Sequence, residues 1–401
     1  MNTTAWPRTL AAATLMALVA GGRASSGLFV SPLNTATGMG LASLSLALAV
    51  GQLAIGLAQP LMGSLADRFG AARIIVLGAL FMIFTTAVPA LWPIPIAVGV
   101  ALVASAVAGS AVGSNGLLVG EVSRAVPANR AGFAVGLVGA GGSLGQLVLG
   151  PVTQWAIDLH GWSAALLGMA VLSLIALPLA ALFRRPAGTK PAAPAQAVRD
   201  VLRDWRFVRI AASFGVCGFH VGFLTVHMPG VIERCGLPSS LAGSWIGVAG
   251  AANIAGSLVI ALALRRYAAA PLLAGIYLVR ALGIAALLAL PASPAVMLGF
   301  AVVMGASYMA TLPPSAQIVA RQHGVQRLGT LFGVVMLVHQ IGSFAGIWLG
   351  GWAAEATGSD TLLWSIDIAL ALIAAGLVYA KGFQRLVPGR TQRAAVPAVR
   401  L

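Results

Sequence analysis

The chain has 401 residues, of which 59% are hydrophobic and only 8% are charged, and its formal net charge is +15. The apolar residues form blocks of about twenty residues separated by short basic connections, which excludes an ordinary soluble domain and is typical of polytopic membrane proteins. Since the cations lie mostly in those connections, we attribute the positive charge to membrane topology and expect no nucleic-acid partner.

Each apolar block is long enough to cross a hydrocarbon core of roughly 30 Å as an α-helix, which satisfies its own backbone hydrogen bonds. The first block is long and contains an arginine, so we expect a helix there and not a cleaved signal peptide. The sequence predicts an all-α membrane protein with twelve transmembrane helices, at residues 8–31, 41–62, 74–93, 96–119, 131–155, 163–183, 207–230, 241–264, 268–291, 294–318, 329–353 and 361–382.

A polar stretch rich in Pro, Ala and Arg follows the sixth block and predicts a linker between two bundles. If both termini are cytoplasmic, all Lys and Arg residues except Arg23, Arg234 and Arg280 fall on the cytoplasmic side, as the positive-inside rule requires. The predicted units are an N-terminal six-helix bundle (1–183), the linker (184–206), a C-terminal six-helix bundle (207–383) and a tail (384–401).

The two predicted bundles match each other at one constant offset of 197 residues without a gap. The matched pairs are Pro32 with Pro229, Arg68 with Arg265, Arg124 with Arg321, Arg130 with Arg327, Gly136 with Gly333, Gly145 with Gly342, Asp158 with Glu355, Gly161 with Gly358 and Arg184 with Lys381. Because six is an even number of spans, the halves keep the same orientation and are related by an axis along the membrane normal. This register places Arg23 opposite His220.

The connection after the second block, "GSLADRFGAAR", contains Gly63, Asp67, Arg68, Gly70 and Arg73 and resembles the loop 2–3 signature of the major facilitator superfamily. The resemblance extends over the whole chain and implies transport by alternating access. These five residues are then candidates for a conformational latch, in which Asp67 pairs with an arginine or a helix N-terminus in only one conformer. The alternative is that the charges only fix the topology.

Within that superfamily, "SSGLFVSPLN", "GFHVGFLTVHMPGVIERCG" and "GTLFGVVMLVHQIGSFAGIWLGG" look most like the monocarboxylate and oxalate/formate carriers. This resemblance implies a small organic anion as the substrate, with helices 1, 4, 7 and 10 lining the cavity. Monocarboxylate carriers have an Asp-x-x-x-Arg pair on helix 8, and the aligned positions here are Ala249 and Asn253. The aspartate thought to carry the proton in that family is therefore missing.

Arg23 and Arg280 lie inside predicted spans, where each charge costs on the order of 2.5 to 3.5 kcal/mol. A guanidinium matches a carboxylate bidentately, so we interpret Arg23 as a clamp for an anionic substrate and Arg280 as a candidate for the same task. The alternative for Arg23 is a structural arginine bound to backbone carbonyls or a hydroxyl.

Further candidate substrate ligands are the polar residues of the later spans: Tyr308, His220, His339, Gln340 and Asn253. His220 and His339 are also candidates for proton coupling, although a histidine in an apolar helix is as often a packing residue. The adjacent Pro313 and Pro314 predict a kink with freed carbonyls in the tenth span. Asp367 is the only carboxylate well inside a predicted span, and the sequence does not assign it a partner.

The sequence contains no phosphate loop, no Cys/His metal cluster and no nucleophile set, so we expect neither an enzyme nor a cofactor or metal. We predict a monomeric secondary carrier in a bacterial inner membrane, with a mono- or dicarboxylate as substrate and a proton or counter-anion as coupling partner. The alternatives are proton-coupled efflux of amphipathic compounds and a non-transporting membrane receptor or assembly factor.

Overall fold

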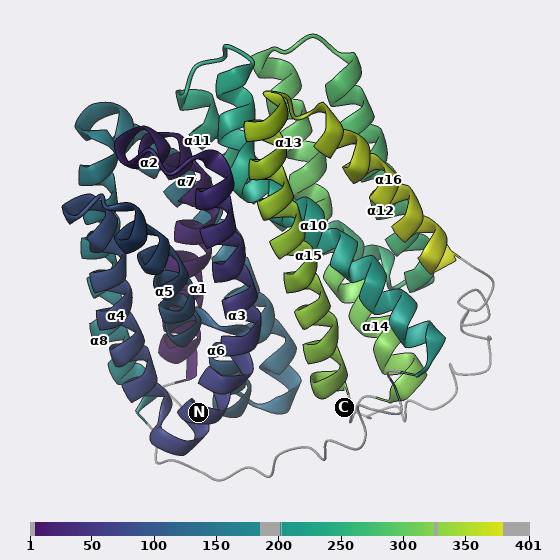
Figure 1. The fold of residues 1–401 in the computed structure, drawn as a ribbon. Helices are drawn as coiled ribbons and strands as arrows, with labels where there is room; N and C mark the ends of the chain where they lie inside the picture. Colours follow the sequence, from purple (N-terminus) through teal and green to yellow (C-terminus); the bar gives the residue numbers. More distant parts are fainter. Residues whose placement is uncertain (1–4, 185–200, 202, 325–327, 380–401) are drawn as a thin grey trace, which may run out of the picture.

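The computed structural model describes residues 5–184, 201, 203–324 and 328–379, and these residues form helices joined by short turns (Figure 1). Eleven helical segments are long and apolar enough to cross a membrane. The longest, Arg130–Phe183, turns back at Gly161, whose backbone (φ 81°, ψ 164°) is not helical, so it contains two spans. The predicted all-α fold is confirmed, and the described residues provide twelve spans. The tail 384–401 and most of the predicted linker lie outside the described residues.

The N-terminal half holds the first six spans. Its elements are α1 (Ala5–Ala24), η1 (Ser25–Phe29) and α2 (Val30–Thr37), which together form the first span, followed by α3 (Leu41–Phe69), α4 (Ala71–Leu91), α5 (Pro95–Gly113), α6 (Asn115–Ala125), α7 (Ala128–Leu172), η2 (Ser173–Ile175), α8 (Ala176–Ala180) and η3 (Ala181–Phe183). The first span is longer than predicted and passes through a short 3-10 turn two residues after Arg23.

The C-terminal half holds the other six spans. Its elements are α10 (Trp205–Arg234), α11 (Ser240–Ala263), α12 (Ala269–Ala289), α13 (Pro294–Tyr308), η4 (Met309–Thr311), α14 (Leu312–His323), α15 (Leu328–Thr357) and α16 (Thr361–Tyr379). The tenth span is broken at η4, directly before Pro313 and Pro314, as the prolines predict.

The 197-residue register reappears in the backbone. Gly161 and Gly358, which lie 197 residues apart, both have positive φ (81° and 65°) where the chain turns between adjacent spans. Gly21 lies against the backbone of α7 at Gly145, and its counterpart Gly218 lies against the backbone of α15 at His339, so close that a β-carbon would collide in either place. The same pair of helices is therefore packed backbone to backbone in each half.

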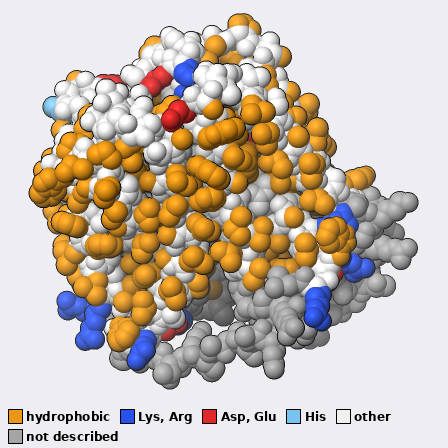
Figure 2. Space-filling view, in the orientation of Figure 1, with side chains coloured by type: hydrophobic (Ala, Val, Ile, Leu, Met, Phe, Trp, Pro, Cys, Tyr) orange, Lys and Arg blue, Asp and Glu red, His pale blue; other side chains and the backbone are white. Residues whose placement is uncertain are grey.

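The two halves stand side by side, and the N-terminus lies at one face of the bundle, where Arg8 donates to the carbonyl of Leu182, just before the predicted linker (Figure 1). We call this the linker face, and the face with the turns at Gly38, Gly161 and Gly358 the opposite face. Arginines gather at the linker face, whereas a broad hydrophobic belt covers the middle of the visible side of the molecule (Figure 2). That belt is the surface expected to meet lipid.

Contacts between the halves lie towards the opposite face. Two apolar clusters near that face draw residues from both halves, for example Val30 and Ala49 with Val226 and Ile347. Near the linker face, the described buried residues form two large clusters that each belong to one half. The halves are thus closed together at the opposite face and packed separately at the linker face.

Two carboxylates also join the halves at the opposite face, and they lie 197 residues apart, at equivalent positions of the two halves. The Glu355 carboxylate at the end of α15 accepts a hydrogen bond from Ala42 N in the first turn of α3 (2.7 Å). Asp158 accepts one from the Ser239 hydroxyl, at the start of α11 (3.5 Å). Each half therefore places one acid at a helix N-terminus of the other half, where the helix dipole favours negative charge.

Candidate functional site

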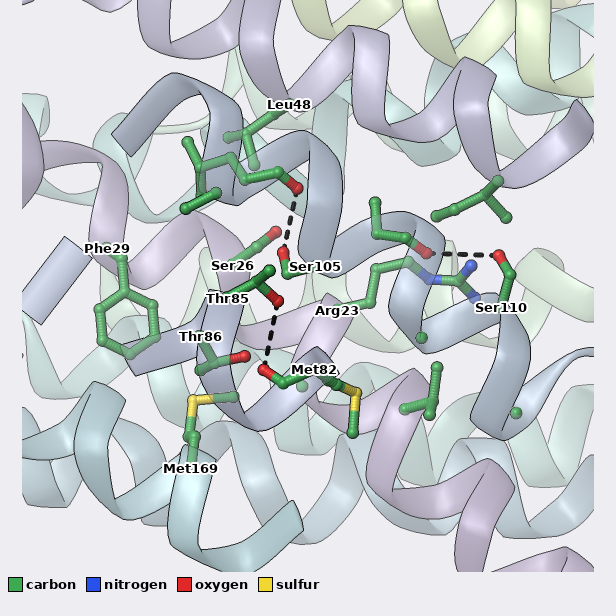
Figure 3. A pocket seen from close by; sticks show the side chains of 18 of the residues that line it. Arg23, Ser26, Phe29, Leu48, Met82, Thr85, Thr86, Ser105, Ser110 and Met169 are labelled. Atoms are coloured by element: carbon green, nitrogen blue, oxygen red, sulfur yellow. Dashed lines mark hydrogen bonds between the residues drawn. The ribbon is translucent and has the colours of Figure 1, made fainter. Parts of the chain in front are cut away.

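A cavity of about 190 Å³ opens beside the first span. Its walls come mainly from the N-terminal half, from α1, α3, α4, α5 and the sixth span, and the C-terminal half adds Thr225, Val226 and Ile347. The wall is largely apolar, and its polar groups project from several helices (Figure 3). This combination of an apolar wall with a few polar groups is typical of small-molecule sites.

Arg23 extends from α1 into this cavity, with its guanidinium beside Ser110 (Figure 3). The side chain is exposed, and among the described residues it has no hydrogen bond or ion pair. It is also the only charged residue among the described residues of the wall. Within the described part of the chain, Arg23 therefore has neither the carbonyl partner nor the hydroxyl partner that the sequence left open as an alternative.

Sequence reasoning missed most of the polar wall. Hydroxyls and amides come from Ser26, Gln52, Gln59, Thr85, Thr86, Ser105, Ser110, Ser114 and Ser173. Several are occupied within their own helices: Thr85 donates to the Phe81 carbonyl (2.9 Å) and Ser105 to the Leu102 carbonyl (3.0 Å). The Gln52 Oε1, a hydrogen-bond acceptor, is buried and has no hydrogen-bond partner in the described residues.

Tyr308 lies at a second, smaller cavity of about 30 Å³ between the halves, together with Gln146 and Trp245. Its hydroxyl is 3.5 Å from Thr225 Oγ1. Thr225 borders both cavities. The predicted residues Arg23 and Tyr308 are therefore on neighbouring cavities that share one residue.

Arg280 is 1% exposed and is not part of either cavity wall. Its Nε donates to Ser307 Oγ (3.1 Å), and its Nη2 donates to the carbonyl oxygens of Ser307 (2.5 Å) and Tyr308 (3.3 Å). These carbonyls belong to the last residues of α13, where the helix breaks and they lose their helical partners. In this conformation Arg280 therefore caps the broken tenth span.

His220 and Asp367 are both fully buried, on α10 and α16. His220 Nε2 is 3.3 Å from Asp367 Oδ1 and 3.0 Å from the Asp367 backbone oxygen. The acid that the sequence left unassigned therefore has a histidine partner. His339 is half-buried beside Phe214, and its Nδ1 lies 3.3 Å from Gln340 Oε1.

Two of the predicted site residues lie between the halves. Asn253 Nδ2 donates to Ser143 Oγ in α7 (2.9 Å), and its Oδ1 accepts from Met309 N at the helix break (3.0 Å). Gln340 packs against Gly56 of α3. The residues predicted as one site are thus distributed over the cavity wall, the seam between the halves and a buried cluster in the C-terminal half.

The family model of the Major Facilitator Superfamily matches residues 12–347. The chain belongs to the major facilitator superfamily. A crystal structure of a D-xylose-proton symporter is similar to this facilitator, with a TM-score of 0.72 and 16% identity over 94% of this chain and 97% of that chain. A bacterial homolog of the human lysosomal transporter Spinster, in an inward-facing and unoccupied conformation, has a TM-score of 0.69 and 17% identity over 94% and 95%. No curated protein sequence matches the chain.

The family identifies a membrane transporter and not an enzyme. At such low identity the two structures establish the fold of this facilitator and leave its substrate open. The finer resemblance to carboxylate carriers remains a prediction.

The superfamily signature of this facilitator lies at the turn from α3 to α4. Gly70 has φ 91°, which favours glycine, and Gly63 faces the backbone of Gly116. Asp67 is 3.3 Å from Arg124, which also pairs with Glu121 (2.6 Å). The partner of Asp67 is thus an arginine of its own half, while Arg68 lies over the Phe69 ring. The conformational latch formed by Gly63, Asp67, Arg68, Gly70 and Arg73 stays a prediction.

Proposed function

We propose that this facilitator is a secondary carrier for a small organic anion, a mono- or dicarboxylate. The observation that carries the proposal is the charge of the cavity wall: Arg23 is its only charged residue among the described ones, and its guanidinium has no hydrogen bond or ion pair with any described residue. A planar guanidinium presents paired N–H donors that fit a carboxylate bidentately. A bound anion would offset the cost of keeping a cation in the middle of the bundle.

The size and polarity of the cavity support the same class of ligand. A volume of about 190 Å³ suits a compact molecule. The hydroxyls of Ser26 and Thr86 offer donors for a second carboxylate or a hydroxyl group. The apolar remainder of the wall fits a short carbon skeleton.

We further propose that the linker face is cytoplasmic and the membrane a bacterial inner membrane. The arginines at the linker face and the positive-inside rule support this orientation. The structure then represents a state closed to the outside, in which an anion reaches Arg23 from the cytoplasm. A single chain contains both halves, so a monomer suffices for alternating access.

The substrate class is tested by thermal stabilisation of the purified protein, because a ligand that binds only the folded state raises its stability by about 2.7 kcal/mol at one hundred times Kd. Lactate, succinate and oxalate are the probes, and D-xylose and a lipophilic cation represent the competing classes. We expect at least one carboxylate to raise the melting temperature and Arg23→Gln to abolish that rise. Arg266→Gln, an exposed arginine of the linker face, is the matched control and should leave it unchanged.

Stabilisation by D-xylose or by the lipophilic cation alone would replace the anion with a sugar or a drug-like compound. A carboxylate response that survives Arg23→Gln would show that the anion binds elsewhere.

A further inference from the structure

The C-terminal half contains a group of ionisable side chains that the cavity does not use. His220 on α10 and Asp367 on α16 are both 0% exposed, and Arg280 on α12 is 1% exposed. His220 Nε2 and Asp367 Oδ1 are 3.3 Å apart, and Arg280 is close enough to interact electrostatically with both residues. Three helices thus bring an acid, a base and a fixed cation together in the hydrophobic part of the molecule.

The hydrogen bonding of this group is incomplete. Among the described residues, neither Asp367 carboxylate oxygen has a hydrogen-bond partner of normal geometry, and His220 Nδ1 and Arg280 Nη1 have none either. A buried carboxylate without hydrogen bonds is far more costly than a buried carboxylic acid, which favours a proton on Asp367. Arg280 has the opposite effect because its charge stabilises the carboxylate. The site can therefore exist with and without its proton.

We propose that Asp367 and His220 bind one exchangeable proton and that this pair is the proton-coupling site of the carrier. The proton is carried on the Asp367 carboxyl group, and breaking its O–H bond releases the proton and leaves a carboxylate. His220 Nε2–H, which donates to the Asp367 backbone oxygen (3.0 Å), also lies 3.3 Å from Oδ1 and stabilises that carboxylate. Both groups are sealed from solvent in this state, so the proton cannot exchange with water until the C-terminal half rearranges. This inference rests on the proposed function in one respect, because it assumes that the protein is a carrier whose transport uses the proton.

Arg280 connects the pair to the cavities. It holds the carbonyls of Ser307 and Tyr308 at the break of the tenth span. The Tyr308 hydroxyl reaches Thr225, which borders the cavity of Arg23. Loss of the proton draws Arg280 towards the carboxylate and weakens its hold on these carbonyls. The charge of Asp367 is thereby linked to the position of Tyr308.

Other ionisable groups surround the pair and belong to the same electrostatic environment. Cys217 on α10 and Tyr277 on α12 both interact with Arg280, and the Arg280 guanidinium lies 5.7 Å from the Tyr277 ring centre. His339 on α15 and Tyr308 on α13 interact with Cys217. None of these four provides a second carboxylate, so a titrating carboxyl signal from this region can be assigned to Asp367.

The test is an infrared titration of the full chain in lipid vesicles, with pH as the only variable. We expect a carboxylic-acid C=O band that shifts in D₂O and disappears as the pH rises. Asp367→Asn should abolish the band, and His220→Gln should displace its midpoint. His227→Gln is the matched control because His227 is a buried histidine of the same helix, bound to the Ile347 carbonyl (2.7 Å), and it should leave the midpoint unchanged.

A band that persists in Asp367→Asn would overturn the proposal, and so would a wild-type protein without any titrating band. If Asp367→Asn does not fold, the comparison of His220→Gln with His227→Gln decides: equal midpoints refute the shared proton. Because no carboxylate substrate is present, this result is independent of the thermal-stabilisation test. A failed anion assay and a failed proton assay are therefore distinguishable.

Discussion

Removing the two carboxylates that join the halves at the opposite face should shift the carrier away from the conformation described here. Glu355 meets the first turn of α3 and Asp158 meets the start of α11, so each acid crosses from one half to the other. A charge at an exposed helix N-terminus is worth 0.3 to 1 kcal/mol, and solvent screening keeps it within that range. We take about 0.7 kcal/mol for each contact.

The two contacts are far apart in sequence and share no partner, so their effects should add to about 1.4 kcal/mol. That amount changes an equilibrium constant about tenfold. The variant Glu355→Gln with Asp158→Asn should therefore lower the ratio of this conformation to the one open at the opposite face by about tenfold, and each single change should lower it about threefold.

Electron-spin distance measurements check this shift. Spin labels at Ser64→Cys and Arg266→Cys, both exposed and in different halves at the linker face, report the separation of the halves when the exposed Cys235 is replaced by serine. We expect the population with the shorter distance to grow in the double variant. Asp360→Asn is the control, because Asp360 pairs with Arg234 inside one half (2.6 Å).

An unchanged distance distribution in the double variant would show that the carboxylates do not select the state. An equal shift in Asp360→Asn would show that any loss of charge at this face has the same effect.

Three further predictions concern stability, measured as the unfolding temperature of the purified protein. Gly218→Ala places a β-carbon against the backbone carbonyl of His339 and should destabilise the protein by about 1 to 3 kcal/mol. Gly136→Ala places its β-carbon in open space and should be neutral or stabilising. Equal effects of the two substitutions would contradict the close packing at Gly218. Gly161→Ala must adopt a positive φ and should cost about 1 to 2 kcal/mol, a loss that Gly136→Ala also controls. Arg280→Gln leaves the carbonyls at the helix break without their charged donor and should cost about 3 kcal/mol, and a loss below 1 kcal/mol would refute its capping role.

Much of the architecture was predictable because it is expressed as composition along the chain. Apolar blocks set the spans, the constant offset revealed the duplicated halves, and the two adjacent prolines located the break at Met309–Thr311. Gly161 and Gly358 matched in sequence and proved to be equivalent turns.

The residues of the site were less predictable, because the sequence of a uniformly apolar helix does not indicate which of its faces points into the bundle. Both faces of α4 are apolar, so nothing distinguished Thr85 and Thr86 as wall residues from hydroxyls that only bond their own helix. Asp367 could be placed by depth along α16, but only the structure shows that it turns towards His220 and away from lipid. The sequence predicts Asn253 as a substrate ligand, but it does not reveal that both ends of its amide bond other helices in this conformation.

The two halves contribute very different numbers of residues to the wall of the Arg23 cavity, and this difference has an evolutionary consequence. Nearly all of its wall lies between Leu18 and Ser173, while the buried acid and histidine lie after residue 205. Under the proposed function, the two duplicated halves have diverged, so that the first half binds the substrate and the second half contains the buried acid and histidine. Selection for growth on a new substrate should therefore yield adaptive substitutions mostly in the first half of the gene.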